Sequence, residues 1–228
     1  MNIISIKQLN SGYGKLQILH DVDFAAQNNL TIIVGANGSG KSTLLKSIYG
    51  LCDVYGGTIT YKDKQIQNIA PHMLATLGIS YMPQRNNVFF ELTIQENLII
   101  ANHNINFEHI FELFPVLKKY LYKKATVLSG GQRQLLAMAM ALATSPSILL
   151  LDEPTANLSP KNAGMVLDKI KEIRQKLNCC VIMVEQNVLD SLKICDVCYL
   201  FSGGSVIFHG DPQQLLSDKS LGKKYLGM

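Results

Sequence analysis

An α/β fold with a mainly parallel sheet is the class that this sequence predicts. Short, mostly apolar runs at residues 30–34, 148–151 and 179–184 have the pattern of strands that are buried on both faces. Helical patterns alternate with these runs, which favours helices packed on the faces of one parallel sheet. Alternating strands near the N-terminus predict an antiparallel part, and residues 85–145, with little strand signal, predict an inserted helical lobe.

The length and composition fit one globular domain. The chain has 228 residues, of which 47% are hydrophobic and 17% are charged, so there is enough apolar material for a core. We expect a single domain over residues 1–228. Within it, residues 1–84 and 146–228 would form the core that carries the sheet, and residues 85–145 would form a helical subdomain.

Charge and hydropathy exclude two classes of protein. The net charge of +4 is mild and no dense Lys-Arg face accompanies it, so nucleic acid is not an expected partner. No apolar run reaches the roughly 18 to 20 residues that a membrane helix needs. Residues 1–9 alternate, with Lys7 among them, and do not resemble a signal peptide. We therefore expect a soluble chain that acts at a membrane only through another chain.

In the first third of the chain, short strands alternate with turns. The expected elements are an edge strand at 2–6, a turn at 11–14, strands at 18–25 and 30–34, a helix at 43–49, a turn at Gly56-Gly57, and strands at 58–61 and 78–82. Lys62-Asp63 would form a hairpin tip. Pro71 predicts the start of a short helix, because proline fits the first helical turn.

Helix signals dominate the middle of the chain and strands return after it. Thr93 and Glu96 form a capping-box pattern at the start of a helix. The expected elements are helices at 93–101, 107–113 and 131–144, a strand at 148–151, a helix at 160–176, a strand at 179–184, a hairpin of 196–201 and 206–209 across Gly203-Gly204, and a closing helix capped by Asp211-Pro212.

Cysteine and histidine spacing does not predict a metal site. Cys195 and Cys198 have the C-x-x-C spacing that redox and zinc sites use. Their position at the start of the apolar run 199–201 favours buried strand thiols instead. The five histidines are scattered and form no metal-ligand pattern.

The most informative stretch is Gly35-Ala36-Asn37-Gly38-Ser39-Gly40-Lys41-Ser42, between a predicted strand and a predicted helix. This is the context in which a glycine-rich P-loop binds phosphate, because its N–H groups and the helix N-terminus face the anion. Lys41 would reach the outer phosphates of a nucleoside triphosphate, and the Ser42 hydroxyl would ligate Mg²⁺. The residues expected to contact the nucleotide here are Gly35, Asn37, Gly38, Ser39, Gly40, Lys41, Ser42 and Thr43.

Tyr13 is a candidate for the nucleotide base. It lies on a predicted turn ahead of the P-loop, and an aromatic ring can stack on a base. A tyrosine that merely packs against the core is the alternative.

Polar residues follow three of the predicted parallel strands. Gln84, Asp152-Glu153 and Gln186 would meet at one edge of the sheet, where α/β proteins bind ligands. Asp152 is placed for a second-shell Mg²⁺ carboxylate, so Ser42, Gln84 and Asp152 form the predicted metal site. Glu153 is the candidate general base for an attacking water. The alternative is that the two carboxylates are a helix N-cap and the residue next to it.

A second glycine motif, Leu128-Ser129-Gly130-Gly131-Gln132, precedes another predicted helix. Ser129 and the bare glycine N–H groups could bind a second anion. One nucleotide does not need two such sites in one chain. The motif therefore favours a head-to-tail dimer, in which Ser129, Gly130, Gly131 and Gln132 contact a nucleotide held by another subunit.

Together these motifs resemble those of the ATP-binding-cassette ATPases. The matching segments are residues 35–42 (P-loop), Gln84 (Q-loop), 128–132 (signature) and 148–153 (Walker B with its glutamate), in family order, and the resemblance covers residues 1–217. It implies a P-loop ATPase core, with Mg²⁺-ATP as substrate and adenine stacked on Tyr13. It also implies that Gln84 links Mg²⁺ to the helical lobe, and that Glu153, Lys41 and Gln186 are catalytic.

Two positions depart from the family pattern. Gln186 stands where the family usually has histidine, and Ser159 stands where an aspartate is usual before Pro160. Glutamine can donate a hydrogen bond to phosphate but cannot become a cation. The form Val184-Glu185-Gln186-Asn187 resembles the ATPase subunits of branched-chain amino-acid importers.

The resemblance implies a set of partners. Integral-membrane permease subunits, a second ATPase subunit in a homodimer or heterodimer, and indirectly a substrate-binding protein are expected, with the chain peripheral on the cytoplasmic face of the cell membrane. Within residues 85–98, Phe89 and Phe90 are candidates to grip a permease helix, and lobe core is the alternative. The alternative function is a lone cassette outside transport, such as a cluster-assembly scaffold.

Overall fold

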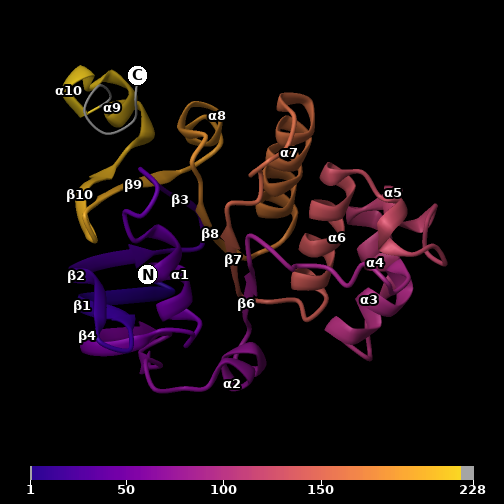
Figure 1. The fold of residues 1–228 in the computed structure, drawn as a ribbon, viewed down its shortest axis with the longest axis horizontal. Helices are drawn as coiled ribbons and strands as arrows, with labels where there is room; N and C mark the ends of the chain where they lie inside the picture. The colour runs from indigo at the N-terminus through magenta and orange to yellow at the C-terminus, as the bar shows by residue number, and fades with distance from the viewer. Residues whose placement is uncertain (1, 222–228) are drawn as a thin grey trace.

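The computed structural model describes residues 2–221 of the chain. Two β-sheets lie at one end of the molecule, and a group of helices, α3 to α6, lies at the other (Figure 1). The predicted core bounds 1–84 and 146–228 include residues 1 and 222–228, which lie outside the described residues. The α/β class with an antiparallel part and an inserted helical region is confirmed.

The larger sheet is mainly parallel, as predicted. Its strand order is β10-β9-β3-β8-β7-β6, and only the β9–β10 hairpin is antiparallel. The strands are β3 (Leu30–Gly35), β6 (Ile79–Met82), β7 (Ile148–Asp152), β8 (Cys180–Val184), β9 (Val197–Ser202) and β10 (Ser205–Gly210). Every residue of β3, β7 and β8 is buried, which explains their continuous apolar runs.

The smaller sheet is antiparallel, with strand order β2-β1-β4-β5. Its strands are β1 (Ile4–Tyr13), β2 (Leu16–Ala26), β4 (Asp53–Tyr61) and β5 (Lys64–Gln65). Two predictions were wrong here. The first strand lies between β2 and β4 rather than at an edge, and it continues to Tyr13, so the chain turns at Gly14-Lys15 and not already from residue 11.

The predicted turn at Gly56-Gly57 was also wrong, because both glycines lie inside β4. The register of β1 against β4 shifts between Lys7 and Asn10, at a bulge beside these glycines. Gly57 has a φ of +83°, and a Cβ there would lie 2.3 Å from the carbonyl oxygen of Gln8. The glycine is therefore needed for close approach of two strands rather than for a reversal of the chain. The turn at Lys62-Asp63 was predicted correctly.

Most helices begin and end where their signals predict. The helices are α1 (Lys41–Ile48), α2 (Pro71–Thr76), α3 (Ile94–Ala101), α4 (Phe107–Leu113), α5 (Pro115–Lys118), α6 (Gly130–Leu142), α7 (Pro160–Lys176), α8 (Val188–Leu192), α9 (Pro212–Ser217) and α10 (Lys219–Leu221), with a 3₁₀ turn at Ala125–Val127. Thr93 and Glu96 form the predicted capping box of α3, and Asp211 caps α9. The short helices α5, α8 and α10 were not predicted.

The larger sheet separates two hydrophobic cores. Side chains alternate along a strand, so Ile32 of β3 packs into one core and Ile33 into the other. The first core joins the sheet to α6, α7 and the helices around Phe114, and the second joins it to α1 and the smaller sheet. Packing on both faces fixes the strands, so the loops at their carboxyl ends start from rigid positions.

Residues 2–221 contain neither a candidate membrane span nor a candidate metal cluster. No helix there is both long and apolar enough to cross a bilayer, and no group of three or more His, Cys, Asp or Glu side chains is placed to hold a metal ion. Cys198 is buried in β9, as expected. Cys195 precedes the strand and is only half-buried, so the interpretation as two strand thiols was half right.

Candidate active site

The P-loop has a closed shape that only glycine permits at its start. β3 ends at Gly35, whose φ is +150°, and a Cβ there would lie 2.3 Å from the carbonyl oxygen of Phe201. Gly38 and Gly40 also have positive φ values, of +76° and +101°. The loop therefore turns tightly from β3 into α1, and its N–H groups can face an anion.

Lys41 lies within this loop. Its side chain is 4% exposed, and Nζ donates hydrogen bonds to the carbonyl oxygens of Gly35 (2.8 Å) and Ala36 (2.9 Å). Burial lowers the pKa of the amine. Ser39 Oγ is buried in the same loop without a hydrogen-bond partner among the described residues. An orphaned hydroxyl beside a buried cation fits a phosphate group, which accepts hydrogen bonds and carries negative charge.

Asp152, at the end of β7, joins two hydroxyl groups. Its Oδ1 accepts from Ser42 Oγ at 2.7 Å, and its Oδ2 accepts from the Tyr81 hydroxyl at 2.9 Å. Burial and the adjacent Asp152 charge raise the pKa of Tyr81, which keeps the hydroxyl protonated as a donor. Sequence reasoning predicted Ser42 and Asp152 but missed Tyr81, whose position on β6 beside β7 was the available signal.

Two side-chain amides donate hydrogen bonds to Glu153. Gln186 Nε2 donates to Glu153 Oε2 at 2.6 Å, and Gln84 Nε2 donates to the same oxygen. The Glu153 backbone is in the left-handed region, with φ of +48°, and its N–H donates to the carbonyl oxygen of Val184 at 3.0 Å. The three strand ends that carry Gln84, Glu153 and Gln186 thus meet at one point, as predicted.

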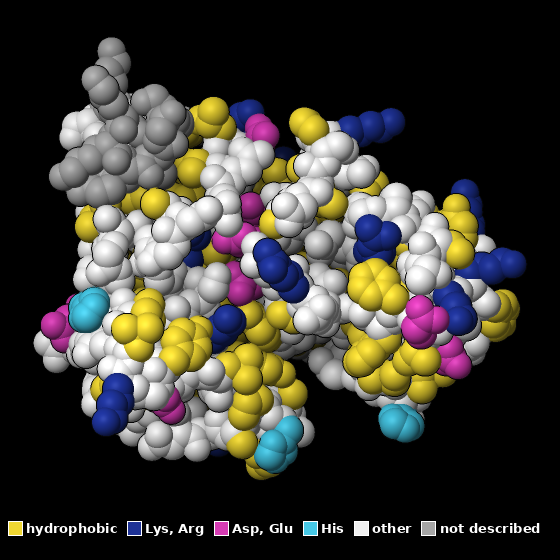
Figure 2. All heavy atoms as spheres, in the orientation of Figure 1, with side chains coloured by type: hydrophobic (Ala, Val, Ile, Leu, Met, Phe, Trp, Pro, Cys, Tyr) yellow, Lys and Arg dark blue, Asp and Glu magenta, His cyan; other side chains and the backbone are white. Residues whose placement is uncertain are grey.

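A cavity of about 340 Å³ connects this cluster with the P-loop. It is lined by Tyr13, Ile18, Asn37, Gly38, Ser39, Gly40, Lys41, Ser42, Thr43, Gln84, Glu153 and Gln186. The structure therefore brings together most of the residues predicted for nucleotide and catalysis. Gly35 and Asp152 lie behind the lining, where Lys41 and Ser42 contact them. Acidic side chains are visible over β7 and β8 in the centre of the space-filling view (Figure 2).

Tyr13 is at the edge of this cavity and is partly exposed. The ammonium of Lys46 lies 5.9 Å from the centre of its ring. Local burial and a hydrogen bond with Cys52 raise the pKa of Tyr13 to about 12. The ring is therefore neutral at physiological pH and has the position and the exposed surface that stacking on a base requires.

The second glycine motif begins α6. Ser129 Oγ accepts from Gln132 N (3.3 Å), and Gln132 Oε1 accepts from Ser129 N (3.0 Å), which makes a capping box. At Gly131, a Cβ would lie 2.7 Å from Met165 Cε, so the helix approaches α7 closely. Ser129, Gly130, Gly131 and Gln132 are absent from the lining of the P-loop cavity. The structure does not bring them to the P-loop of the same chain.

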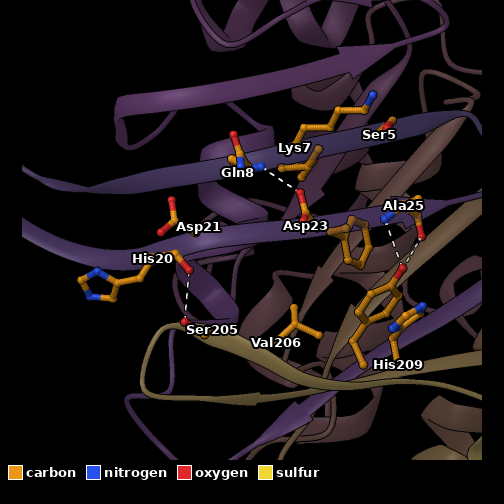
Figure 3. A pocket seen from close by; sticks show the side chains of 13 residues that line it. Ser5, Lys7, Gln8, His20, Asp21, Asp23, Ala25, Ser205, Val206 and His209 are labelled. Atoms are coloured by element: carbon orange, nitrogen blue, oxygen red, sulfur yellow. Dashed lines mark hydrogen bonds between the residues drawn. The ribbon is translucent and has the colours of Figure 1, made fainter.

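A larger cavity lies elsewhere and contains none of the predicted site residues. It measures about 870 Å³ and lies between β1 and β2 on one side and β9 and β10 on the other. Figure 3 shows its lining, in which Ser205 Oγ donates to the carbonyl oxygen of His20 and the Tyr199 hydroxyl contacts the backbone of Ala25. The chemistry of the lining, rather than volume, therefore identifies the site near the P-loop.

Known proteins resemble the chain over nearly its whole length. Residues 19–156 match the protein family described as ABC transporter. The probable branched-chain amino acid transport ATP-binding protein LivF of Archaeoglobus fulgidus is 44% identical, over 97% of each chain. The high-affinity branched-chain amino acid transport ATP-binding protein BraG of Pseudomonas aeruginosa is 32% identical, over 99% of this chain and 100% of its own.

A solved structure agrees with these relatives. A nucleotide-free ATP-binding cassette from an ABC transporter superimposes with a TM-score of 0.88 at 27% identity, covering 97% of each chain. These comparisons support a role in transport and not the alternative of a scaffold ATPase. The chain belongs to the ABC transporter family, and it is an ATP-binding and ATP-hydrolysing subunit of such a transporter.

Proposed function

We propose that this chain hydrolyses Mg²⁺-ATP at the interface between two ATPase subunits and thereby drives permease subunits that import branched-chain or other hydrophobic amino acids. The chain would be peripheral, on the cytoplasmic face of the cell membrane. The observation that carries the proposal is the meeting of Gln84, Glu153 and Gln186 at the inner end of the P-loop cavity.

Glu153 is the proposed general base. A carboxylate in this position can orient a water in line with the outer phosphate and accept its proton. The amides of Gln84 and Gln186 hold the carboxylate in one orientation before ATP binds, because both donate to the same oxygen. Lys41 and the P-loop N–H groups stabilise the negative charge on the transferring phosphate. Gln186 donates to the phosphate when the γ-phosphate occupies the cavity.

The donor set fits Mg²⁺. Ser42 Oγ and Asp152 Oδ1 are 2.7 Å apart, and Gln84, whose side chain has an amide oxygen, lines the same cavity as Ser42. Hydroxyl, carboxylate and amide oxygens are hard ligands of the kind that Mg²⁺ prefers, together with water and phosphate. Bound Mg²⁺ would neutralise charge on the phosphates. Ser42, Asp152 and Gln84 are the residues that would hold it.

A second subunit would complete the site. Ser129, Gly130, Gly131 and Gln132 lie outside the P-loop cavity, at the N-terminus of α6, where N–H groups favour an anion. We assign them to the γ-phosphate of a nucleotide held by the partner subunit. The partner is either a second copy of this chain or a related ATPase.

The helical subdomain, residues 85–145, is the proposed contact with the permease. Phe89 and Phe90 follow the Gln84 loop and remain 51% and 46% exposed, which supports a docking role over lobe core. The names of LivF and BraG, which refer to branched-chain amino acid transport, support the substrate class. A substrate-binding protein would then deliver the amino acid to the permease.

The test is Glu153→Gln, with Glu172→Gln as a matched control on the surface of α7. We expect Glu153→Gln to bind ATP, to lose about 100-fold or more in turnover, and to accumulate as a nucleotide-bound dimer on gel filtration. Turnover near the wild-type rate would refute the assignment of the base. Uptake of labelled leucine by proteoliposomes that contain the assembled transporter tests the substrate class, and ATP-dependent uptake of other solutes alone would refute it.

A further inference from the structure

We propose that Glu185 is a positioning residue for hydrolysis, because its buried carboxylate ties the loop after β8, which carries Gln186, to the loop after β7, which follows Glu153. This inference rests on the proposed function, since it assigns catalytic roles to Glu153 and Gln186. Glu185 is part of the form Val184-Glu185-Gln186-Asn187 described above, but sequence reasoning did not select it as a site residue.

The contacts of Glu185 join two loops through one side chain. Oε1 accepts from Thr155 N at 3.0 Å and from Thr155 Oγ1 at 2.8 Å. Oε2 accepts from Gln186 N at 3.2 Å. The Glu185 backbone N–H donates to the carbonyl oxygen of Ile33 at 3.1 Å, so the link is also fixed to β3, the strand that leads into the P-loop.

A purely structural role does not require a carboxylate in this position. Glu185 is 1% exposed, and burying a carboxylate is costly unless donors surround it. Burial raises the pKa of this group, which reflects that cost, and Glu153 is an additional nearby negative charge. The three N–H and O–H groups that donate to Glu185 offset part of this cost. This cost favours a role in fixing the positions of the two loops over a role in stabilising the core.

The position of the link explains what it controls. A second cavity, of about 480 Å³, is lined by Thr155, Asn157, Leu158 and Glu185 among others, and it shares Gln84, Glu153 and Gln186 with the P-loop cavity. Glu185 lines the second cavity, and its neighbour Gln186 lines both. When Gln186 moves toward a γ-phosphate, the shared carboxylate transmits that movement to Thr155 and the loop that follows it.

The link lies beside two neutral residues. Gln186 is neutral, and Ser159 makes no side-chain cap to α7. Neither residue can form an ion pair across the loops. The three hydrogen bonds that Glu185 accepts connect the two loops instead. Thr155, with both its N–H and its hydroxyl on one carboxylate oxygen, is the partner residue on the second loop.

The experiment compares Glu185→Ala, Glu185→Gln and Thr155→Val with Glu172→Gln as a control for loss of a carboxylate. We expect Glu185→Ala to lower kcat about tenfold or more while the KM for ATP changes less than about threefold, because the P-loop contacts are intact. Glu185→Gln can still accept from Thr155 but turns an amide NH₂ toward Gln186 N, so its kcat should be intermediate. Turnover is expressed per nucleotide-binding molecule, which removes any effect of misfolded protein.

A double-mutant cycle shows whether the two residues act through each other. Thr155→Val should lower kcat in the wild-type background and have little further effect in Glu185→Ala. The inference is overturned if Glu185→Ala turns over at the wild-type rate. If the alanine variant does not fold, wild-type turnover in both Glu185→Gln and Thr155→Val overturns it instead. It is also overturned by additive effects in the cycle. Failure of the proposed function would appear separately, as normal turnover in Glu153→Gln.

Discussion

Tyr81 shows how one hydroxyl outside the known motifs can affect the site. Its bond to Asp152 Oδ2 leaves Oδ1 for Ser42 and fixes the plane of the carboxylate. A hydrogen bond to a charged group contributes about 1.5–3 kcal/mol. Without it, the carboxylate can rotate, and the oxygen set proposed for Mg²⁺ loses its fixed geometry.

We therefore predict that Tyr81→Phe raises the Mg²⁺ concentration needed for half-maximal ATP hydrolysis by about tenfold, with a smaller change at saturating Mg²⁺. A magnesium titration of the ATPase rate measures this. Tyr49→Phe is the matched control, because the Tyr49 ring packs against Tyr81 at 5.4 Å between centroids. Equal magnesium curves for Tyr81→Phe and the control would contradict the prediction.

Glu185 also predicts a pH effect on stability. Burial raises the pKa of its carboxyl, and the hydrogen bonds from Thr155 and Gln186 offset part of the rise. A carboxyl with a raised pKa binds more protons in the folded state than in the unfolded state. Its contribution to stability is therefore fully present below about pH 4.3, the unfolded pKa of glutamate, and is lost as pH rises through the folded pKa.

We predict that Glu185→Gln, which does not titrate, gains stability relative to the wild type as pH rises above about 4.3 through the folded pKa. Urea-induced unfolding of both proteins at a series of pH values measures the difference in the free energy of unfolding. A difference that is constant over this range would show that Glu185 has the same pKa in both states. Groups common to the two proteins cancel in the comparison.

At the scale of elements, local signals predicted the helix ends well. The helices at Phe107–Leu113 and Pro160–Lys176 have the predicted bounds, because proline and capping residues act on their own neighbours. Strand pairing was predicted less well. The Gly56-Gly57 pair has the sequence of a turn, and only its partner strand, with Gln8 at a φ of +48°, shows that it is a bulge. Such pairing depends on residues far apart in the sequence.

The capping box of α3 gives a prediction for this element. Thr93 Oγ1 accepts from Glu96 N at 3.1 Å, and Glu96 Oε2 accepts from Thr93 N at 2.7 Å. We expect Thr93→Ala to lower the free energy of unfolding by about 1 kcal/mol. Chemical denaturation measures the change, and Thr126→Ala, at an exposed position, is the control. Equal losses in both variants would indicate that the cap is not the source of the effect.

At the scale of the whole molecule, sequence reasoning recovered the class of the fold and most of the candidate site. The P-loop and the polar strand ends were accessible because parallel strands bring their carboxyl ends to one edge. Tyr81 and Glu185 were missed, because their contacts with Asp152 and Thr155 cross between strands and loops, and for Tyr81 the only signal was its place on a predicted strand. The structure adds Tyr81, which donates to Asp152, and Glu185, which accepts from Thr155 and from the backbone of Gln186.

The exposed pair Phe89 and Phe90 gives a prediction for the assembled transporter. Replacing both with alanine should remove apolar contact area and lower the amount of permease that co-purifies with the chain by about tenfold or more. The control is Tyr122→Ala, which removes another exposed aromatic ring of the helical region. Quantitative pull-down measures the ratio of the two proteins, and circular dichroism checks folding. Normal recovery of permease with the double variant would place the docking surface elsewhere.

The hydrogen bonds of Lys41 to its own loop have a consequence for how fast the site can reload. Because Nζ bridges Gly35 and Ala36, contacts within the loop itself hold its compact shape. An incoming nucleotide exchanges one set of acceptors for another, and little chain entropy is lost in ordering the loop. Between one product leaving and the next ATP arriving, the loop remains a preorganised receptor, so recovery of the loop's shape adds no slow step to the cycle.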